Sequence, residues 1–92
     1  MRVIDTFEQL QEYCNYLHGG NVVYKLLMRD DTFYYGRTQD IFNRYFQHLQ
    51  DKDVIQLCII DDFMSYETSF ALEQQLISEN ISNTKCINIK LG

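Results

Sequence analysis

The chain contains no proline and no apolar run close to the roughly 18 to 20 residues that cross a bilayer. The lack of proline argues against an extended linker. The first segment, MRVIDTFEQLQ, carries acidic residues where a secretory signal peptide has an uninterrupted apolar stretch. We therefore expect a soluble protein with no membrane partner, located in the cytoplasm, or in the host cytoplasm if the chain is viral.

Cysteine is also scarce, with only Cys14, Cys58 and Cys86. An odd number of cysteines within predicted helices and strands is typical of free thiols in a reducing compartment. Cys14 and His18 lie one helical turn apart and could ligate a metal, but the other two cysteines show no matching spacing. Ordinary packing is the simpler interpretation of all three.

The 92 residues allow one domain, residues 1–92, and a hydrophobic fraction of 46% excludes a disordered chain. Eight basic and thirteen acidic residues give a formal charge of −5, the wrong sign for non-specific attraction to nucleic acid. The acidic excess is compatible with a homodimer or with a basic protein partner. Half of the basic residues nevertheless fall between positions 25 and 44, namely Lys25, Arg29, Arg37 and Arg44.

Capping residues and apolar periodicity predict an α+β domain with a small sheet. A capping box at Thr6 and Gln9 begins a helix over 7–18, and Thr38 and Ser65 are the expected N-caps of two further helices. Strands are expected at 21–29, at 32–35 and at 54–60, the first two forming a hairpin. Alternation over 85–91 predicts a short edge strand at the end of the chain.

Glu73 is the main anomaly of the third predicted helix. It projects from the middle of an apolar face made of Tyr66, Phe70, Leu72, Leu76, Ile77 and Ile81. A carboxylate there must be neutralised, hydrogen-bonded, paired with a cation or bound to a metal. Pairing with an arginine at the rim of the domain is the simpler alternative to a functional role.

Arg44 and His48 lie four residues apart, so both project from one face of the second predicted helix. A guanidinium beside an imidazole suits an anionic ligand such as phosphate. Taken alone, the pair is explained as well by two solvent-facing side chains on an amphipathic helix.

An ordered set of residues surrounds this pair. Val22-Val23-Tyr24 opens the first strand, Tyr34-Tyr35-Gly36 closes the second, and Arg44, His48 and Glu73 follow. In this order and spacing they resemble the GIY-YIG nuclease superfamily, with Asn88 where that family often has an asparagine. The first triplet lacks the initial glycine, and the second has tyrosine in place of isoleucine.

The resemblance implies a central three-stranded antiparallel sheet flanked by helices, with residues 1–20 as an added N-terminal helix. It implies an endonuclease that hydrolyses phosphodiester bonds in DNA, with Mg²⁺ or Mn²⁺ held by Glu73. Tyr24, its hydroxyl pKa lowered by nearby cations, would orient or deprotonate the attacking water, assisted by Tyr34. Arg44 would stabilise the transition state, and His48 would bind the tyrosine or the phosphate.

Further residues are expected to contact the substrate, with Gly36 allowing a close approach of the backbone: Lys25, Arg29, Gly36, Arg37, Thr38 and Asn88. Seven tyrosines in the chain make packing an alternative for any one of them, and Tyr13, Tyr16, Tyr35, Tyr45 and Tyr66 are interpreted that way. The alternative function is a module of the same fold that binds nucleic acid or a basic protein without cleavage.

Overall fold

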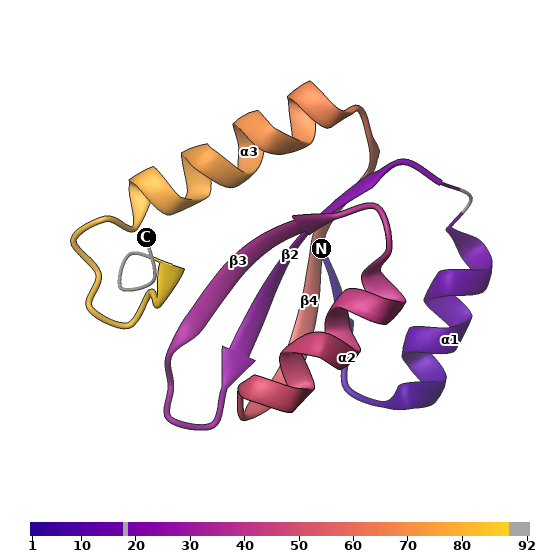
Figure 1. Ribbon diagram of the computed structural model, residues 1–92, viewed down its shortest axis with the longest axis horizontal. Helices are drawn as coiled ribbons and strands as arrows, with labels where there is room; N and C mark the ends of the chain where they lie inside the picture. The colour runs from indigo at the N-terminus through magenta and orange to yellow at the C-terminus, as the bar shows by residue number, and fades with distance from the viewer. Residues whose placement is uncertain (18, 89–92) are drawn as a thin grey trace.

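The structure is a computed structural model, and it describes residues 1–17 and 19–88. It confirms the α+β class, with a four-stranded antiparallel sheet and three helices among the described residues (Figure 1). The elements are β1 (Arg2–Ile4), α1 (Phe7–Tyr16), β2 (Asn21–Met28), β3 (Phe33–Thr38), α2 (Ile41–Asp51), β4 (Val54–Met64) and α3 (Tyr66–Glu79). None of these helices is long and apolar enough to span a membrane.

The sheet has one strand more than the three that the resemblance implies, in the order β1-β4-β2-β3. The additional strand is β1, which pairs with β4 from Arg2 opposite Ile59 to Ile4 opposite Leu57. Three residues are too few for apolar alternation to be recognised, so this strand is defined by its partner and not by its own sequence.

The predicted capping box of α1 is confirmed: Thr6 accepts from the Gln9 amide, and the Gln9 side chain accepts from the Thr6 amide. The helix ends at Tyr16, two residues earlier than predicted. Cys14, Cys58 and Cys86 are free thiols, and burial raises the pKa of Cys14 and Cys58. His18, the other half of the Cys14/His18 pair, lies outside the described residues.

The predicted N-cap of α2 is wrong by two residues. Asp40 caps the helix by accepting from the Asn43 amide at 3.2 Å, while Thr38 is still paired with Val22 at the end of β3. The Thr38 hydroxyl accepts from the Asp40 amide at 2.9 Å. Thr38 therefore fixes the turn that leads into α2, and the carboxylate of Asp40 serves the helix itself.

Strand β4 is longer than predicted and continues through Asp61 and Asp62 to Met64. Two register shifts occur between Asn21 and Tyr24 of the paired strand β2, so the pairing at this end of β4 is irregular. One of the acids has a specific contact, because the Tyr13 hydroxyl donates to Asp62 at 2.9 Å. The prediction that the strand ends at residue 60, before Asp61 and Asp62, is therefore wrong.

Ser65 caps α3 as predicted, but the apolar face of this helix is rotated from the predicted one. Ser69 is fully buried, whereas Tyr66, Phe70 and Ile81 are exposed. The predicted C-terminal strand is wrong for the described part of 85–91, which makes a single parallel bridge between Cys86 and Phe33. Residues 89–91 of that prediction lie outside the described residues.

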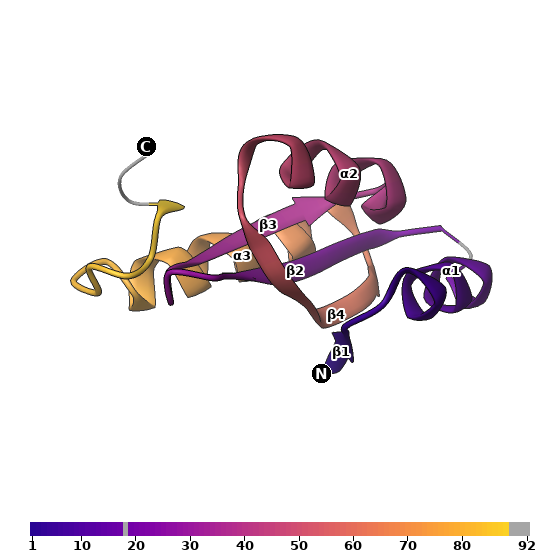
Figure 2. The same cartoon turned by 90° about the horizontal axis from the view of Figure 1, so that it is seen from below.

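The two faces of the sheet bury different clusters. Tyr24 and Leu26 belong to the larger cluster, with residues of α1 and α2, while Phe33 and Tyr35 pack with residues of α3. In both views β3 runs between α2 and α3 (Figures 1 and 2). Side chains from both helices can thus approach the region around β3.

Candidate active site

Tyr24 is the buried centre of the candidate site. It lies on β2 with none of its surface exposed, and its hydroxyl is 2.8 Å from Nε2 of His48 on α2. Gly36 is its partner across the β2–β3 ladder, and a Cβ at Gly36 would overlap Cζ and the hydroxyl oxygen of Tyr24. The glycine therefore makes room for the tyrosine ring, while its expected role in a close approach of a strand end or a ligand stays a prediction.

His48 is neutral in this environment. It is only 6% exposed, and burial, followed by the positive charges of Lys52 and Arg44, lowers its pKa to about 4. A neutral imidazole carries a proton on one ring nitrogen only, so the Tyr24 hydroxyl is the donor to Nε2 in one tautomer and the acceptor in the other. The expectation that His48 binds the tyrosine is confirmed.

The expectation that nearby cations lower the pKa of Tyr24 is wrong when only the protein's own groups act on it. Burial raises the pKa, Tyr34 and Glu73 raise it further, and Arg44 opposes them only in part. The pKa of Tyr34 is also raised, by burial and then by Glu73. Both phenols therefore keep their protons at neutral pH. In this environment Tyr24 acts as a neutral hydrogen-bonding group and not as a phenolate base.

Arg44 and Glu73 act on this tyrosine pair with opposite signs. Arg44 lowers the pKa of both tyrosines and Glu73 raises it, which places a cation from α2 and an anion from α3 within electrostatic reach of both phenols. Neither forms any of the three ion pairs found among residues 1–17 and 19–88. The simpler explanation, that Glu73 pairs with an arginine at the rim of the domain, therefore finds no support among these residues. The Glu73 carboxylate accepts a long hydrogen bond of 3.4 Å from the side-chain amide of Gln74.

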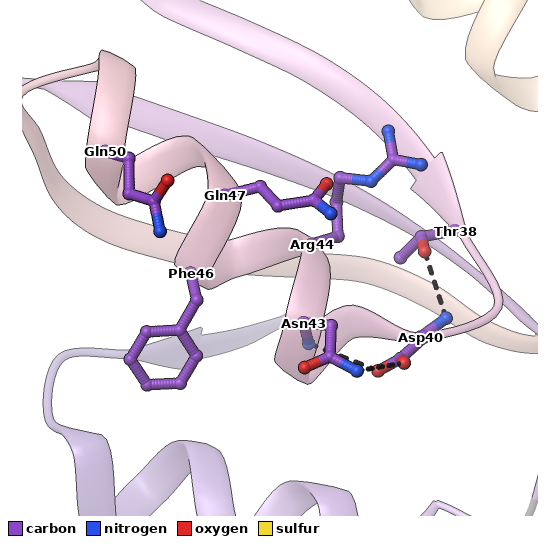
Figure 3. A pocket seen from close by; sticks show the side chains of 7 residues that line it. All are labelled: Thr38, Asp40, Asn43, Arg44, Phe46, Gln47 and Gln50. Carbon is purple, nitrogen blue, oxygen red and sulfur yellow. Dashed lines mark hydrogen bonds between the residues drawn. The ribbon is translucent and has the colours of Figure 1, made fainter.

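A polar depression of about 490 Å³ adjoins Arg44 on the outer side of α2. Asp40 and Asn43 line it and are hydrogen-bonded to each other, because the side-chain amide of Asn43 donates to the Asp40 carboxylate at 2.6 Å. The Arg44 side chain extends away from that pair (Figure 3). Its charge is therefore available to an anionic ligand.

Lys52 belongs to the site but was missed in the sequence. Its Nζ lies 5.1 Å from the ring centroid of Tyr34, and its side chain is only 15% exposed, paired with Asp51 at 3.2 Å. The signal available was its position four residues after His48, on the same side of α2.

The structure does not bring all predicted substrate residues to this site. Lys25 lies on the other face of the sheet, 4.5 Å from the ring centroid of Phe33. Arg29, past the end of β2, pairs with Asp53 at 3.0 Å. The Arg37 guanidinium lies 4.5 Å from the ring centroid of Tyr66 at the start of α3.

Asn88 has a structural contact that uses both the oxygen and the nitrogen of its side-chain amide. Its oxygen accepts from the Tyr35 amide and its nitrogen donates to the Tyr35 carbonyl, both at 2.7 Å. The side chain thus pairs with the outer edge of β3 as a neighbouring strand would. A role for Asn88 in substrate binding stays a prediction, as it does for Lys25, Arg29 and Arg37.

Glu73 fits a divalent cation that keeps most of its water. No group of three or more His, Cys, Asp or Glu side chains in the described part of the chain is arranged to hold a metal alone. Mg²⁺ needs only one or two carboxylates, with water and substrate phosphate as the other ligands. The donor set therefore suits Mg²⁺ or Mn²⁺ and does not suit a structural zinc ion.

No protein-family model matches the chain, and no curated protein or solved structure matches it either. The resemblance to GIY-YIG nucleases consequently depends on the residues and the geometry described above.

Proposed function

We propose that the chain is a metal-dependent endonuclease that hydrolyses phosphodiester bonds in DNA. The observation that carries the proposal is the buried hydrogen bond between Tyr24 and His48, with Arg44 and Glu73 both within electrostatic reach of the tyrosine pair. Packing alone accounts for the opposing glycine, but it does not require a buried imidazole at the hydroxyl or two opposite charges that form no ion pair among the described residues.

In the tautomer with Nε2 unprotonated, His48 fixes Tyr24 by accepting a hydrogen bond from its hydroxyl, and a lone pair of the phenol oxygen accepts from the attacking water once the packing around the fully buried ring admits it. As the water oxygen attacks phosphorus, its proton passes to Tyr24 while the Tyr24 proton passes to Nε2 of His48. The bond from phosphorus to the leaving oxygen breaks, and that oxygen takes a proton from solvent. Arg44 stabilises the additional negative charge on the phosphoryl oxygens.

Glu73 is the residue that would hold Mg²⁺ or Mn²⁺. A bound divalent ion supplies Lewis acidity at the phosphoryl and leaving oxygens. Tyr34 borders the same site, where it contacts the His48 ring at a centroid distance of 5.1 Å. We assign Tyr34 to positioning, because its side chain contacts both His48 and Lys52.

The second candidate, a module that binds nucleic acid or a basic protein without cutting, is favoured by one observation. The chain carries a formal charge of −5, which weakens its attraction to duplex DNA. For either candidate function, a homodimer or a partner subunit would add surface that contacts the nucleic acid. The three free thiols fit a cytoplasmic site of action for both candidates.

Cleavage of a mixed panel tests the proposal: supercoiled plasmid, linear duplex, single-stranded DNA, branched DNA and RNA, each with Mg²⁺ or Mn²⁺. The Glu73→Gln variant should lose cleavage, because it keeps the shape of the side chain but not its charge. Glu79→Gln is the matched control, since Glu79 is an exposed residue of the same helix whose carboxylate contacts Gln75. Absence of cleavage by a folded wild-type protein would favour the binding module.

A further inference from the structure

Two aromatic residues on α3 form an exposed pair that the site described above does not use. Tyr66 is 55% exposed and Phe70 is 46% exposed, although Tyr66 was expected to be a packing residue. Their rings are nearly parallel, with an interplanar angle of 8° and centroids 6.3 Å apart. Half-exposed parallel rings present flat apolar surface to solvent, which a core does not require.

Arg37 supports this aromatic pair from the end of β3. Its guanidinium lies 4.5 Å from the Tyr66 ring centroid, and its one side-chain hydrogen bond within residues 1–17 and 19–88 is a long one of 3.5 Å to Asn21. Its Nε is buried without a hydrogen-bond partner in the described part of the chain. The guanidinium lies over one face of the Tyr66 ring, so it orients that ring, adds positive charge next to it and leaves only the uncovered part of Tyr66, with Phe70, for a base.

The aromatic pair is adjacent to the candidate metal ligand. Phe70 and Glu73 are three residues apart on α3, so they are neighbours on the helix surface, and Tyr66 lies one further turn toward the N-terminus. A strand that lies along Tyr66 and Phe70 therefore approaches Glu73.

Other exposed aromatic residues are arranged differently. Phe7 meets Phe46 at 63°, and Tyr16 meets Phe63 at 74°, so each pair packs edge to face. Among the ring pairs in residues 1–17 and 19–88, the Tyr66 and Phe70 rings alone are stacked. The parallel orientation is thus a property of this position and not of exposed aromatic residues in the chain generally.

We propose that Tyr66 and Phe70 stack unpaired bases of a DNA strand whose phosphate reaches Glu73 and Arg44. The substrate class is then DNA with a single-stranded segment, such as a flap, a bubble or a branch point. Stacking on aromatic rings adds affinity for bases to the local positive charge of Arg37 and Arg44, so the net charge of −5 does not exclude such binding. The bases of a duplex have their faces covered by neighbouring base pairs, so a blunt duplex cannot use the aromatic pair. The direction of the strand rests on the proposed nuclease function, whereas the stacking itself does not.

Binding without metal tests the stacking separately from cleavage. The probe is a fluorescein-labelled single-stranded DNA of about 12 nucleotides, compared with a blunt duplex and with single-stranded RNA, all in EDTA. Wild type should bind the single strand more tightly than the duplex. Phe70→Leu and Tyr66→Leu should each weaken that binding by about tenfold. Phe7→Leu is the matched control, because Phe7 is 49% exposed and lies on α1.

Tryptophan fluorescence adds a direct readout. The sequence has no tryptophan, so Phe70→Trp gives a single reporter, whose emission should be quenched when a base stacks on it. Unquenched emission, or equal binding by wild type and both leucine variants, would overturn the proposal even if the protein cleaves DNA. Dissociation of a wild-type dimer by Phe70→Leu would overturn it as well, since the pair would then be a self-association surface. Quenching together with preference for the single strand supports it, and if cleavage is absent, only the proposed function fails.

Discussion

Gly36 faces Tyr24 across the β2–β3 ladder, and the ring of Tyr24 occupies the space where a side chain at position 36 would lie. The two motif residues that suggested a nuclease are therefore one packing unit. The glycine permits the tyrosine ring to lie across β3, and the position of the ring carries its hydroxyl to His48 at 2.8 Å. A motif recognised as two separate triplets is in this fold a single steric requirement.

Gly36→Ala should disturb Tyr24 specifically. The added methyl group would overlap the phenol ring, so we expect unfolding to become easier by about 1–3 kcal/mol and cleavage to fall. Urea unfolding measures the first effect. In a Tyr24→Ala background the same substitution should cost much less, because the clashing ring is gone. Equal costs in both backgrounds would contradict the steric explanation.

Replacing either site tyrosine by phenylalanine should separate their roles. Tyr24→Phe removes the hydrogen-bond partner of a buried imidazole, so we expect a loss of about 1 kcal/mol in stability and a fall in cleavage of at least about 100-fold. Tyr34→Phe removes a hydroxyl for which the described residues supply no hydrogen-bond partner, and should leave the melting temperature nearly unchanged. Thermal unfolding and plasmid cleavage of both variants, side by side, check the contrast.

The pKa of His48 gives the protein a predictable response to acid. Its folded-state pKa is about 4 against an ordinary value of 6.5, so the unfolded chain binds more protons between these two values. Stability should therefore fall as the pH drops from 6.5 toward 4, by up to about 3 kcal/mol from this residue. Urea unfolding at several pH values measures the slope. His48→Gln keeps an acceptor for Tyr24 and should remove this part of it, and an unchanged slope would mean that other groups cause it.

The sequence predicted the elements that are specified by residues close together in the chain. The capping box at Thr6, the Ser65 cap and the β2–β3 hairpin are confirmed, because each depends on residues only a few positions apart. Strand β1 and the continuation of β4 past Asp61 depend on pairing across the sheet, which no local pattern encodes. The rotated face of α3 has a similar cause, since the small Ser69 is buried where apolar periodicity expected large side chains.

The residues of the candidate site were predicted from the sequence, but their burial and pKa directions were not. Spacing and resemblance selected Tyr24, Arg44 and Glu73, which the fold brings within electrostatic reach of one another. The direction of the Tyr24 pKa could not be predicted, because it depends on burial beneath α2 and not on the order of residues. Lys52 was missed for the same reason, since its contact with the Tyr34 ring exists only in three dimensions.

Asn88 should prove structural when it is replaced. Asn88→Ala removes both hydrogen bonds to the Tyr35 backbone, and we expect a loss of about 1–2 kcal/mol in stability with unchanged affinity for single-stranded DNA. Asn88→Asp retains the acceptor but sets a carboxylate against the Tyr35 carbonyl, so it should destabilise the fold too. Weaker DNA binding at unchanged stability would instead support the substrate role implied by the family resemblance.

Divalent metal should stabilise the protein through Glu73. A ligand that binds only the folded state at ten times its Kd adds about 1.4 kcal/mol, which for a domain of this size raises the melting temperature by about 6 °C. Mg²⁺ or Mn²⁺ should therefore shift thermal unfolding of wild type but not of Glu73→Gln. Glu79→Gln should keep the shift, because its carboxylate lies at the exposed end of α3 away from the tyrosine pair. A shift that survives in Glu73→Gln would place the metal elsewhere and remove Glu73 from the proposed chemistry.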